Sequence, residues 1–464
     1  MQAETSQRPF GMRDKIGYLF GDFGNDFTFI FASSFLMVFY TKVLGIDPAA
    51  VGVLFVIARC IDAFTDVTMG RLVDTFQGTQ KGRFRPWILW ISGPVALMSF
   101  LMYQSALASA PMIWKLVYMY VTYILWGSVF YTMINIPYGS MASVISSDPE
   151  HRASLSTYRS VGAGLAALLI GVGAPLLIYT TDASGNQVVS GGRFTLIAGV
   201  FSVLAVICYL LCYALTTERV NFVPGKTQKK VSLGETFSAL LHNRALVAII
   251  GAAIFLLLSQ LITQNLNNYL FADYFKDTRA LSLINILSTV PMLLIAPFVI
   301  RIIQRYGKKE SGMAATFAAG LAYLTLFFLK IKNPYVYCAV AAIASLGQGY
   351  FNLIIWAYIT DVIDYQEVRH HTRDDGTIYA VYSFARKIGQ ALAGGLGGFA
   401  LSLIGYDSLA TVQADSVLQG IYNTTTLVPA VSFLIVAAIL AFGYPLNKKL
   451  VEQNHQELLR RHKA

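Results

Sequence analysis

The chain has 464 residues, of which 55% are hydrophobic and only 13% are charged, and its formal net charge is +10. Soluble globular domains carry about 25% charged residues, so this composition excludes an ordinary soluble protein. Apolar segments of about 20 residues, the length that crosses a bilayer, recur from end to end and predict an all-α membrane protein.

The hydropathy pattern predicts about twelve membrane-spanning helices. In the first half we expect them at about 16–40, 50–74, 86–107, 113–144, 154–180 and 193–216. In the second half we expect them at about 245–272, 280–303, 311–330, 335–362, 377–405 and 423–445. Glu4 and Arg8 precede any apolar stretch, so we expect no cleavable signal peptide.

The longest polar stretch between spans runs from about 217 to 243 and divides them six and six. This predicts an N-terminal six-helix bundle (1–216), a central cytoplasmic loop (217–243), a C-terminal six-helix bundle (244–446) and a cytoplasmic tail (447–464). About two thirds of the 35 Lys and Arg residues fall on the N-terminus, the tail and the connections on their side. Because cytoplasmic loops carry the excess of positive charge, we expect a multi-pass protein of the bacterial inner membrane with both termini in the cytoplasm. This charge faces the anionic leaflet, and no nucleic-acid partner is needed to explain it.

Three charged residues stand in the middle of the second predicted span, in the segment Arg59-Cys-Ile-Asp62-Ala-Phe-Thr-Asp66. A single Asp at the bilayer centre costs about 3 kcal/mol on insertion scales. Spacings of three and four place Arg59, Asp62 and Asp66 on one helix face. Acidic residues inside a membrane usually face the polar interior of the protein and have a function there. We therefore expect this helix face to bind Na+ or a proton.

Polar side chains also stand inside five other predicted spans. In chain order they are Asp22 and Asp26; Tyr131, Thr132 and Asn135; Arg159; Trp356, Asp361 and Asp364; and Arg386, Lys387 and Gln390. Carboxylates, amides and basic groups hold vicinal hydroxyls through paired hydrogen bonds, and aromatic rings stack on the C–H face of a sugar. This inventory suits a sugar better than a hydrophobic drug or a bare ion. Asp361 and Asp364 stand towards the cytoplasmic end of their span, where we expect a gating ion-pair network.

Basic turns that contain glycine occupy matched places in the two halves. Gly70-Arg-Leu-Val-Asp74 and Lys81-Gly-Arg83-Phe-Arg-Pro join the second and third spans, and Arg305-Tyr-Gly-Lys-Lys309 joins the eighth and ninth. Such turns are typical of the major facilitator architecture, in which substrate binds between two helix bundles near the bilayer midplane. We expect Asp74 to pair with a nearby basic loop and, with Arg83, to hold the cytoplasmic gate.

A membrane enzyme would need a nucleophile–base set or a metal cluster. The four cysteines lie inside predicted spans without a disulfide or zinc spacing, and the six histidines lie in loops and the tail. We therefore expect a protein that is not an enzyme and that has no cofactor beyond a coupling cation, H+ or Na+.

Several of these segments together resemble the glycoside–pentoside–hexuronide:cation symporters, a branch of the major facilitator superfamily that includes the melibiose permease. The matching motifs are Gly21-Asp22-Phe-Gly-Asn-Asp26, Ala58-Arg59-Cys-Ile-Asp62-Ala-Phe-Thr-Asp66, Lys81-Gly-Arg-Phe-Arg-Pro-Trp87, Asn135-Ile-Pro-Tyr-Gly-Ser140, Asp361-Val-Ile-Asp-Tyr365 and Arg386-Lys387. They span nearly the whole chain. The resemblance implies a cation site, with Na+ as a candidate occupant, at Asp62, Asp66 and Thr132. It also implies a sugar site around Asp26, Arg159, Lys387 and Trp356.

The fourth span departs from the melibiose permease, because Asn135 and Gly139 stand where that protein has an aspartate and a tryptophan. Two segments, around Asn135 and around Gln390, look more like the β-glucuronide carriers. Replacing an acid by Asn while keeping the basic residues leaves a more positive pocket, which favours a sugar that carries a carboxylate. A β-xyloside or other neutral glycoside is the alternative substrate, since β-xyloside carriers share much of this pattern.

Two other classes of membrane protein remain alternatives. A lipid transporter predicts few polar residues of the kind that bind sugar, and a non-transporting sugar sensor would bind sugar without moving it. We expect a monomer whose partners are a small sugar or glycoside and membrane lipid.

Overall fold

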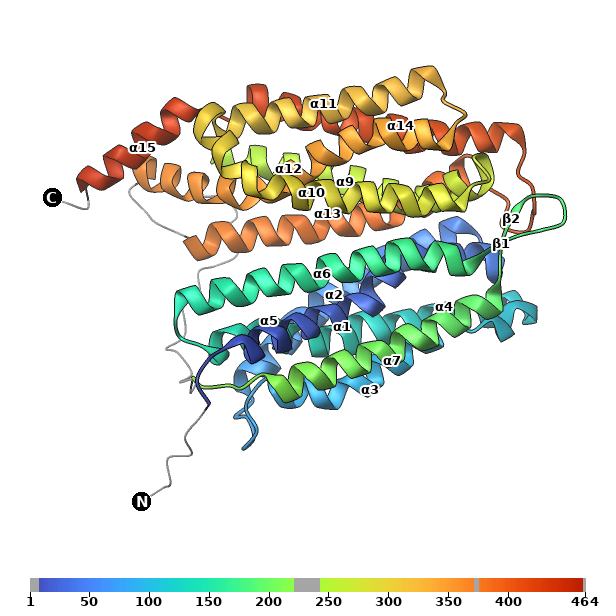
Figure 1. Cartoon of the computed structure of the whole chain (residues 1–464), viewed down its shortest axis with the longest axis horizontal. Helices are drawn as coiled ribbons and strands as arrows, with labels where there is room; N and C mark the ends of the chain where they lie inside the picture. The colour runs from blue at the N-terminus through green and yellow to red at the C-terminus, as the bar shows by residue number, and fades with distance from the viewer. Residues whose placement is uncertain (1–7, 221–242, 371–374, 462–464) are drawn as a thin grey trace. The chain divides into compact units, whose positions relative to one another are not determined.

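Long helices follow the apolar segments of the chain (Figure 1). The computed structural model describes residues 8–220, 243–370 and 375–461. The elements of the first half are α1 (Met12–Val38), η1 (Phe39–Val43), α2 (Pro48–Thr75), α3 (Arg85–Leu101), η2 (Ser105–Ser109), α4 (Met112–Ile124), η3 (Leu125–Tyr131), α5 (Thr132–Ile145), α6 (Pro149–Ile178), β1 (Tyr179–Thr181), β2 (Gln187–Val189) and α7 (Gly191–Leu215). Those of the second half are α9 (Arg244–Tyr269), η4 (Leu270–Tyr274), α10 (Thr278–Tyr306), α11 (Lys308–Leu329), α12 (Pro334–His370), α13 (Asp375–Leu403), α14 (Asp415–Ala438), η5 (Ile439–Gly443) and α15 (Lys448–Arg461). The elements η1, η3, η4 and η5 are short π-helical stretches that continue the helix before them.

The helices account for all twelve predicted spans. Nine helical segments of the described residues are long and apolar enough to cross a membrane, and α10, bent by 42° after Met292, makes a tenth. Two further helices, α2 and α13, have comparable lengths of 28 and 29 residues. Charged residues lower the hydropathy of α2, and several side chains of α13 lie outside the described residues. The chain is therefore a multi-pass helical membrane protein.

Two helices extend beyond their predicted ranges. The helix expected at 335–362 runs on to His370 as α12, and the one expected at 423–445 begins at Asp415 as α14. Both extensions carry charged residues, among them Glu367 and Asp415. Hydropathy marks the part of a helix that contacts lipid, so it misses turns that continue into water.

The chain folds as two compact units, residues 1–226 with 407–411, and residues 227–406 with 412–464. In the first unit α1 packs against α6 and α7, and α3 packs against α7. In the second unit α9 packs against α13 and α14, and α11 packs against α14. In order along the chain, these are the pairings first–fifth, first–sixth and third–sixth within each set of six spans. The two units therefore repeat the same helix packing.

A basic residue before the first span of each unit holds the end of the last span. In the first unit Arg8 Nη2 donates to the carbonyl of Leu215 over 2.8 Å. In the second unit Arg244 donates to the carbonyls of Phe442 and Gly443 over 2.9 and 3.2 Å. The carbonyls at a helix C-terminus lack partners within the helix, so a guanidinium there satisfies them and complements the helix dipole.

A second pair of contacts also recurs. Arg85, at the start of the third span, donates to the carbonyl of Tyr213 near the end of the sixth, over 2.6 Å. Lys309, at the start of the ninth span, donates to the carbonyl of Tyr444 after the twelfth, over 2.7 Å. The glycine-containing basic turns that recur in the sequence thus make equivalent contacts in the two units.

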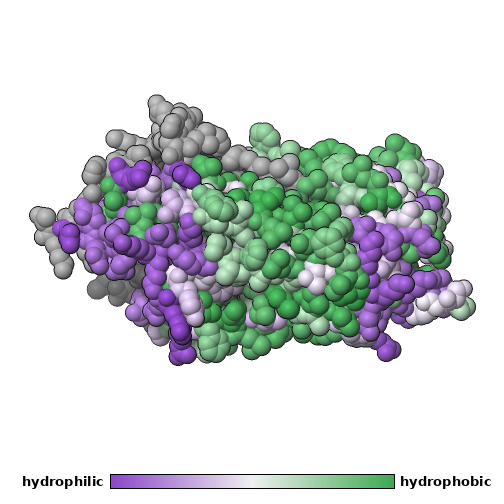
Figure 2. Space-filling view, turned by 90° about the horizontal axis from the view of Figure 1, so that it is seen from above, coloured by the Kyte–Doolittle hydropathy of each residue, from purple (hydrophilic) through white to green (hydrophobic). Residues whose placement is uncertain are grey.

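The outer surface is apolar where lipid is expected. On the face shown in Figure 2, hydrophobic residues cover the middle and hydrophilic residues gather towards both ends. Large apolar side chains are exposed on helices of both units, for example Leu196 and Leu294. Such exposure is costly in water and is normal for a surface that contacts hydrocarbon.

Two elements lie in segments where hydropathy predicts no structure. Between α6 and α7 the strands β1 and β2 form an antiparallel hairpin, whose turn uses Gly185 at a φ of 84°. After the last span, α15 packs against α12. The predicted tail therefore begins with a helix that belongs to the second unit.

Candidate functional site

Two acids of α2, Asp62 and Asp66, each accept a hydrogen bond from a hydroxyl of the fourth span. Ser128 Oγ donates to Asp62 Oδ1 over 2.5 Å, and Thr132 Oγ1 donates to Asp66 Oδ1 over 3.2 Å. Arg59 Nη1 lies 3.0 Å from the other oxygen of Asp62, Oδ2. We call Arg59, Asp62, Asp66, Ser128 and Thr132 the α2 acidic cluster. It brings two carboxylates, one guanidinium and two hydroxyls to the place where the second and fourth spans pack.

The backbone of the fourth span is irregular beside this cluster. Ser128 lies inside the π-helical stretch η3, and Thr132 begins α5 directly after it. Thr132 Oγ1 also lies 3.4 Å from the carbonyl oxygen of Gly127, within η3. π-Helical turns widen a helix locally and occur frequently at functional sites. The local geometry thus presents both hydroxyls to α2.

Asp22 on α1 pairs with Arg159 on α6. Arg159 Nε lies 2.9 Å from Asp22 Oδ1, and the guanidinium also lies over the ring of Tyr138, 5.4 Å from its centroid. The ring fits here because residue 21 is Gly21, where a Cβ would overlap it. Asp26, one turn further along α1, is half-buried and forms no ion pair with the described basic side chains. Asp22 therefore offsets the charge of Arg159.

The polar residues of the fourth span have different surroundings. Asn135 Oδ1 lies 3.5 Å from Nδ2 of Asn25 on α1, and Asn25 Oδ1 accepts a hydrogen bond of 2.9 Å from Tyr209. The ring of Tyr131 stacks on Phe29, with 5.3 Å between centroids. Asn135 is thus joined to a buried polar chain, whereas Tyr131 packs within an aromatic cluster.

In the second unit, an arginine lies over a partly exposed tryptophan. Trp356 on α12 is 39% exposed, and the Arg386 guanidinium carbon lies 5.8 Å from the centre of its ring. The buried ring of Tyr382 meets Trp356 edge-on, with 5.4 Å between centroids. No acidic side chain of the described residues pairs with Arg386. A guanidinium over an indole face is held by cation–π attraction, which leaves its N–H groups able to bind an anion.

Three other predicted site residues complete the sugar and gate sets. Gln390 lies one turn after Arg386 on α13 and is half-buried. The side chains of Lys387 and Asp74 lie outside the described residues, so their roles stay predictions.

The predicted gate residues lie in separate contacts in the two units. In the second unit, Lys308 Nζ lies 2.6 Å from Oδ1 of the buried Asp361, and Asp364 is half-buried on the same helix. In the first unit, the Arg83 guanidinium donates to the carbonyl of Val73 over 2.8 and 3.2 Å. Both contacts join a basic turn to a neighbouring helix.

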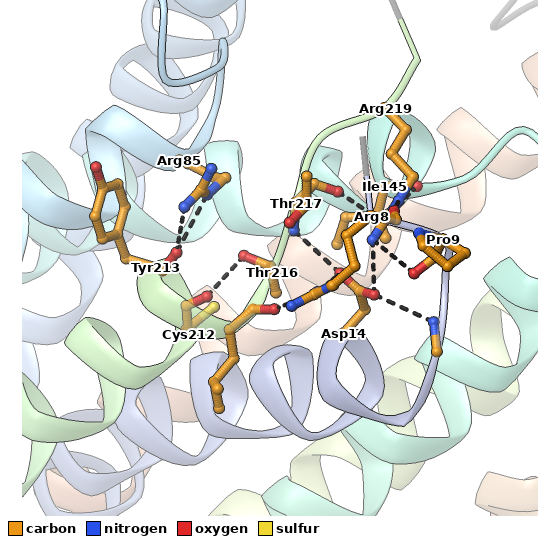
Figure 3. A network of polar contacts seen from close by, with 12 residues as sticks. Arg8, Pro9, Asp14, Arg85, Ile145, Cys212, Tyr213, Thr216, Thr217 and Arg219 are labelled. Atoms are coloured by element: carbon orange, nitrogen blue, oxygen red, sulfur yellow. Dashed lines mark hydrogen bonds and ion pairs between the residues drawn. The ribbon is translucent and has the colours of Figure 1, made fainter. Parts of the chain in front are cut away.

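A buried carboxylate fastens the two ends of the first unit together (Figure 3). Asp14, at the start of α1, has no exposed surface, and its oxygens lie 2.8 Å from Arg8 Nη2 and 2.9 Å from Arg219 Nη2. The backbone N–H groups of Thr217 and Gly11 also donate to it, over 3.1 and 3.2 Å. This network ties the segment after α7 to the start of α1, and nothing in the sequence pattern singled it out.

Sequence reasoning also missed Ser128. A signal for it exists, because Ser128 precedes Thr132 by four residues just as Asp62 precedes Asp66 by four. Two helices that each repeat a polar residue at this spacing can face each other with matched residues.

The cluster offers oxygen ligands from carboxylates and hydroxyls together. Among the residues that the structure describes, no three His, Cys, Asp or Glu side chains gather as metal ligands. A cation at the α2 acidic cluster would therefore also need hydroxyl oxygens. Oxygen ligands of this kind are those that hard cations prefer.

Comparison with known proteins places the whole chain in one family. The family model described as MFS/sugar transport protein matches residues 17–448. An uncharacterized symporter of Bacillus subtilis (strain 168), YjmB, is 30% identical over 461 residues, which cover 99% of this chain and 96% of that one. A glucuronide carrier protein homolog of Escherichia coli (strain K12) is 31% identical, over 97% of this chain and 96% of its own.

A solved structure shares the fold. The crystal structure of a D-xylose-proton symporter matches with a TM-score of 0.64 at 12% sequence identity, over 94% of this chain and 98% of that chain. The helix packing, the repeated contacts and these matches together show a major facilitator fold. The chain belongs to the family of MFS/sugar transport proteins.

Proposed function

We propose that this protein is a symporter that moves a glucuronide or related uronide glycoside together with H+ or Na+ by alternating access. The observation that carries the proposal is an oxygen-rich cluster on α2 together with an arginine of the second unit that lies over a tryptophan. Asp62 and Asp66 each accept a hydrogen bond from a hydroxyl of the fourth span, over 2.5 and 3.2 Å. In the second unit, Arg386 has no acidic partner among the described residues and lies over Trp356. Carboxylate and hydroxyl oxygens suit a cation, and a guanidinium suits an anionic sugar.

The α2 acidic cluster supports the cation half of the proposal. Asp62 and Asp66 bring carboxylate oxygens, and Ser128 and Thr132 bring hydroxyl oxygens, to the place where the second and fourth spans pack. Hard cations prefer oxygen ligands of these two kinds, so the cluster suits a monovalent cation. Asp62, Asp66 and Thr132 are the residues that we propose to hold the coupling cation.

Arg386 supports the anionic substrate. Of the two arginines with described side chains near the predicted sugar positions, Arg159 is paired with Asp22 and Arg386 is not. Trp356, beneath Arg386, is 39% exposed, and an aromatic ring of this kind is a group on which a sugar can stack. The glucuronide carrier homolog among its relatives fits the same substrate class.

Transport of the cation and the sugar is coupled if the empty carrier and the carrier with both ligands bound switch between the outward-facing and inward-facing states more readily than the carrier with one ligand bound. Cation and sugar then raise each other's affinity by the same factor, since the free energy of coupling is reciprocal. We further propose that the two six-helix bundles, 1–216 and 244–446, move around a substrate near the midplane, as in other major facilitators. The contacts of Arg83 and of Asp361 with Lys308 would hold the gate at the cytoplasmic side.

Sugar counterflow in proteoliposomes tests the substrate class without an imposed cation gradient. The probes are phenyl β-glucuronide, the matching β-glucoside and the matching β-xyloside. We expect exchange of the glucuronide in preference to both neutral glycosides. In the Arg386→Gln protein, glucuronide affinity should fall by roughly 10- to 100-fold, because a hydrogen bond to a charged group is worth about 1.5–3 kcal/mol.

Arg386→Lys is the matched control, because it keeps the charge and loses the planar fork, and its glucuronide affinity should lie between those of wild type and Arg386→Gln. Preferred exchange of the xyloside would overturn the uronide assignment and favour a neutral glycoside. If the folded protein exchanges none of the three probes, the glucuronide proposal is wrong. The alternatives are then transport of a different glycoside, transport of lipid, or sugar sensing without transport.

A further inference from the structure

The α2 acidic cluster contains a repeated pattern that its acids alone do not explain. Asp62 and Asp66 are four residues apart on α2, and Ser128 and Thr132 are four residues apart on the fourth span. Each hydroxyl donates to the carboxylate at the same level. The result is a ladder of two rungs, Ser128–Asp62 and Thr132–Asp66, whose two hydrogen bonds join four side-chain oxygens.

The Ser128 hydroxyl is unusual among hydroxyls in the helices of this protein. Serine and threonine side chains in helices commonly donate to the carbonyl four residues earlier in their own helix. Thr41, Thr68 and Thr316 do so here, bonding the carbonyls of residues 37, 64 and 312. Ser128 instead reaches across to α2, where it donates to Asp62 Oδ1 over 2.5 Å and also lies 3.4 Å from the carbonyl oxygen of Ala58. The Ser128 hydroxyl therefore bonds a neighbouring helix and not the backbone of its own helix.

The hydroxyl oxygen of Ser128 can still accept a contact after its hydrogen has been donated to Asp62. Ser128 is fully buried, and its single hydroxyl hydrogen lies on the short contact with Asp62. A hydroxyl oxygen also has two lone pairs that can accept a hydrogen or contact a cation. Ser128 can thus hold Asp62 in place and still offer an oxygen to an ion between the rungs.

We propose that Ser128 is a specificity-determining residue of the cation site, whose hydroxyl completes a four-oxygen set for a monovalent metal ion of the size of Na+ or Li+. The inference rests on the proposed cation coupling and adds a residue to that site. Carboxylate and hydroxyl oxygens from two helices surround the ion, and Arg59 offsets the charge of one acid. The distance between the second and fourth spans then selects ions by size.

Equilibrium binding of ²²Na+ to the purified full-length protein tests this role without any sugar. In Ser128→Ala, the Na+ concentration for half-saturation should rise roughly 10- to 100-fold, the usual loss when a group that supports a metal ligand is removed. Ser128→Thr keeps the hydroxyl and should stay within about threefold of wild type. Competition by Li+ and by K+ for bound ²²Na+ reports how the site selects ions by size. The difference in affinity between Li+ and K+ should be smaller in Ser128→Ala than in wild type.

Two matched variants make the result specific. Thr68→Ala also removes a hydroxyl from α2, but that hydroxyl bonds its own helix, so Na+ binding should not change. Asp66→Asn removes a carboxylate of the ladder, so Na+ binding should be lost. Thermal unfolding of each variant shows that the comparison is made between folded proteins.

Two outcomes would overturn the inference, and a third would support it while overturning the proposed function. Unchanged Na+ binding in a folded Ser128→Ala protein would make the Ser128–Asp62 bond purely structural. Absence of Na+ and Li+ binding in wild type, with sugar uptake driven by a pH gradient, would remove the metal ion and leave proton symport standing. Tight Na+ binding weakened by Ser128→Ala, in a protein that exchanges no sugar, would support Ser128 and overturn the proposed function.

Discussion

Asp22 and Arg159 form an ion pair whose two partners have very different exposure. The Asp22 side chain is 10% exposed and the Arg159 side chain is 42% exposed. Removing one partner of a buried pair leaves an uncompensated charge, whereas removing both leaves none. The pair therefore behaves as a unit, and its members should not be judged by single substitutions.

Asp22→Asn should lower stability more than the double variant Asp22→Asn/Arg159→Gln does. The single change leaves the Arg159 guanidinium without its carboxylate, at a cost of roughly 2 kcal/mol after allowing for its exposure. The measurement is the thermal unfolding midpoint in detergent. Asp26→Asn is the control, because Asp26 forms no ion pair with the described basic side chains, and it should change the midpoint little. Simple addition of the two single losses in the double variant would contradict this account.

Residue by residue, the sequence predicts where charges lie better than it predicts what they contact. Hydropathy and helical spacing put Asp62 and Asp66 on one face of α2 correctly, because those rules act within one helix. Contacts between helices depend on packing that no local pattern contains. For that reason the partnership of Arg159 with Asp22, and the reach of Ser128 to Asp62, emerge only from the folded chain.

At the scale of elements, the start of α3 depends on a residue more than a hundred positions away. Glu218, after α7, accepts three backbone N–H groups, from Arg83, Phe84 and Arg85, over 2.7, 2.9 and 2.7 Å. The first N–H groups of a helix lack partners within it, and a negative charge there also complements the helix dipole. Gly82 makes room, since its φ is 119° and a Cβ would collide with the Glu218 carboxylate.

Glu218→Ala should loosen the turn before α3 more than Glu218→Gln does. The amide keeps one acceptor without the charge, whereas alanine keeps neither, and loss of such a cap costs about 1 kcal/mol. Hydrogen exchange of the backbone amides of Arg83, Phe84 and Arg85 should quicken roughly fivefold in the alanine variant. Glu452→Gln, on the exposed face of α15, is the control and should leave these amides unchanged. Equal exchange in wild type and Glu218→Ala would mean that the start of α3 is held by other contacts.

Elements of the membrane region were predictable because one rule, a run of apolar residues, governs them all. The π-helical stretches, the β1–β2 hairpin and α15 obey other rules. The π turn η3 lies where the fourth span meets α2, and the hairpin depends on strand pairing across a turn at Gly185. Neither leaves a hydropathy signal, so the sequence analysis predicted none of them.

At the scale of the whole molecule, the same basic residues serve structure and orientation. Arg85 and Lys309 satisfy carbonyls at helix ends, and they belong to the positive connections that predict a cytoplasmic side. Carrying such charges through lipid is costly, so the side on which they lie sets the expected orientation. The orientation with both termini in the cytoplasm stays a prediction from the distribution of positive charge.

A pair of single-cysteine variants tests both this orientation and the number of crossings. In a background with Cys60, Cys208, Cys212 and Cys338 replaced by alanine, Ser184→Cys places a thiol in the exposed β1–β2 turn, and Lys449→Cys places one at the start of α15. Seven long helical segments of the described residues separate the two positions, so we expect them to lie on opposite sides of the membrane. A membrane-impermeant maleimide added to right-side-out vesicles should label residue 184 directly and residue 449 only after lysis. The reverse labelling would invert the protein, and labelling of both from outside would mean that one of the seven segments, with the partly described α13 as the first suspect, does not cross.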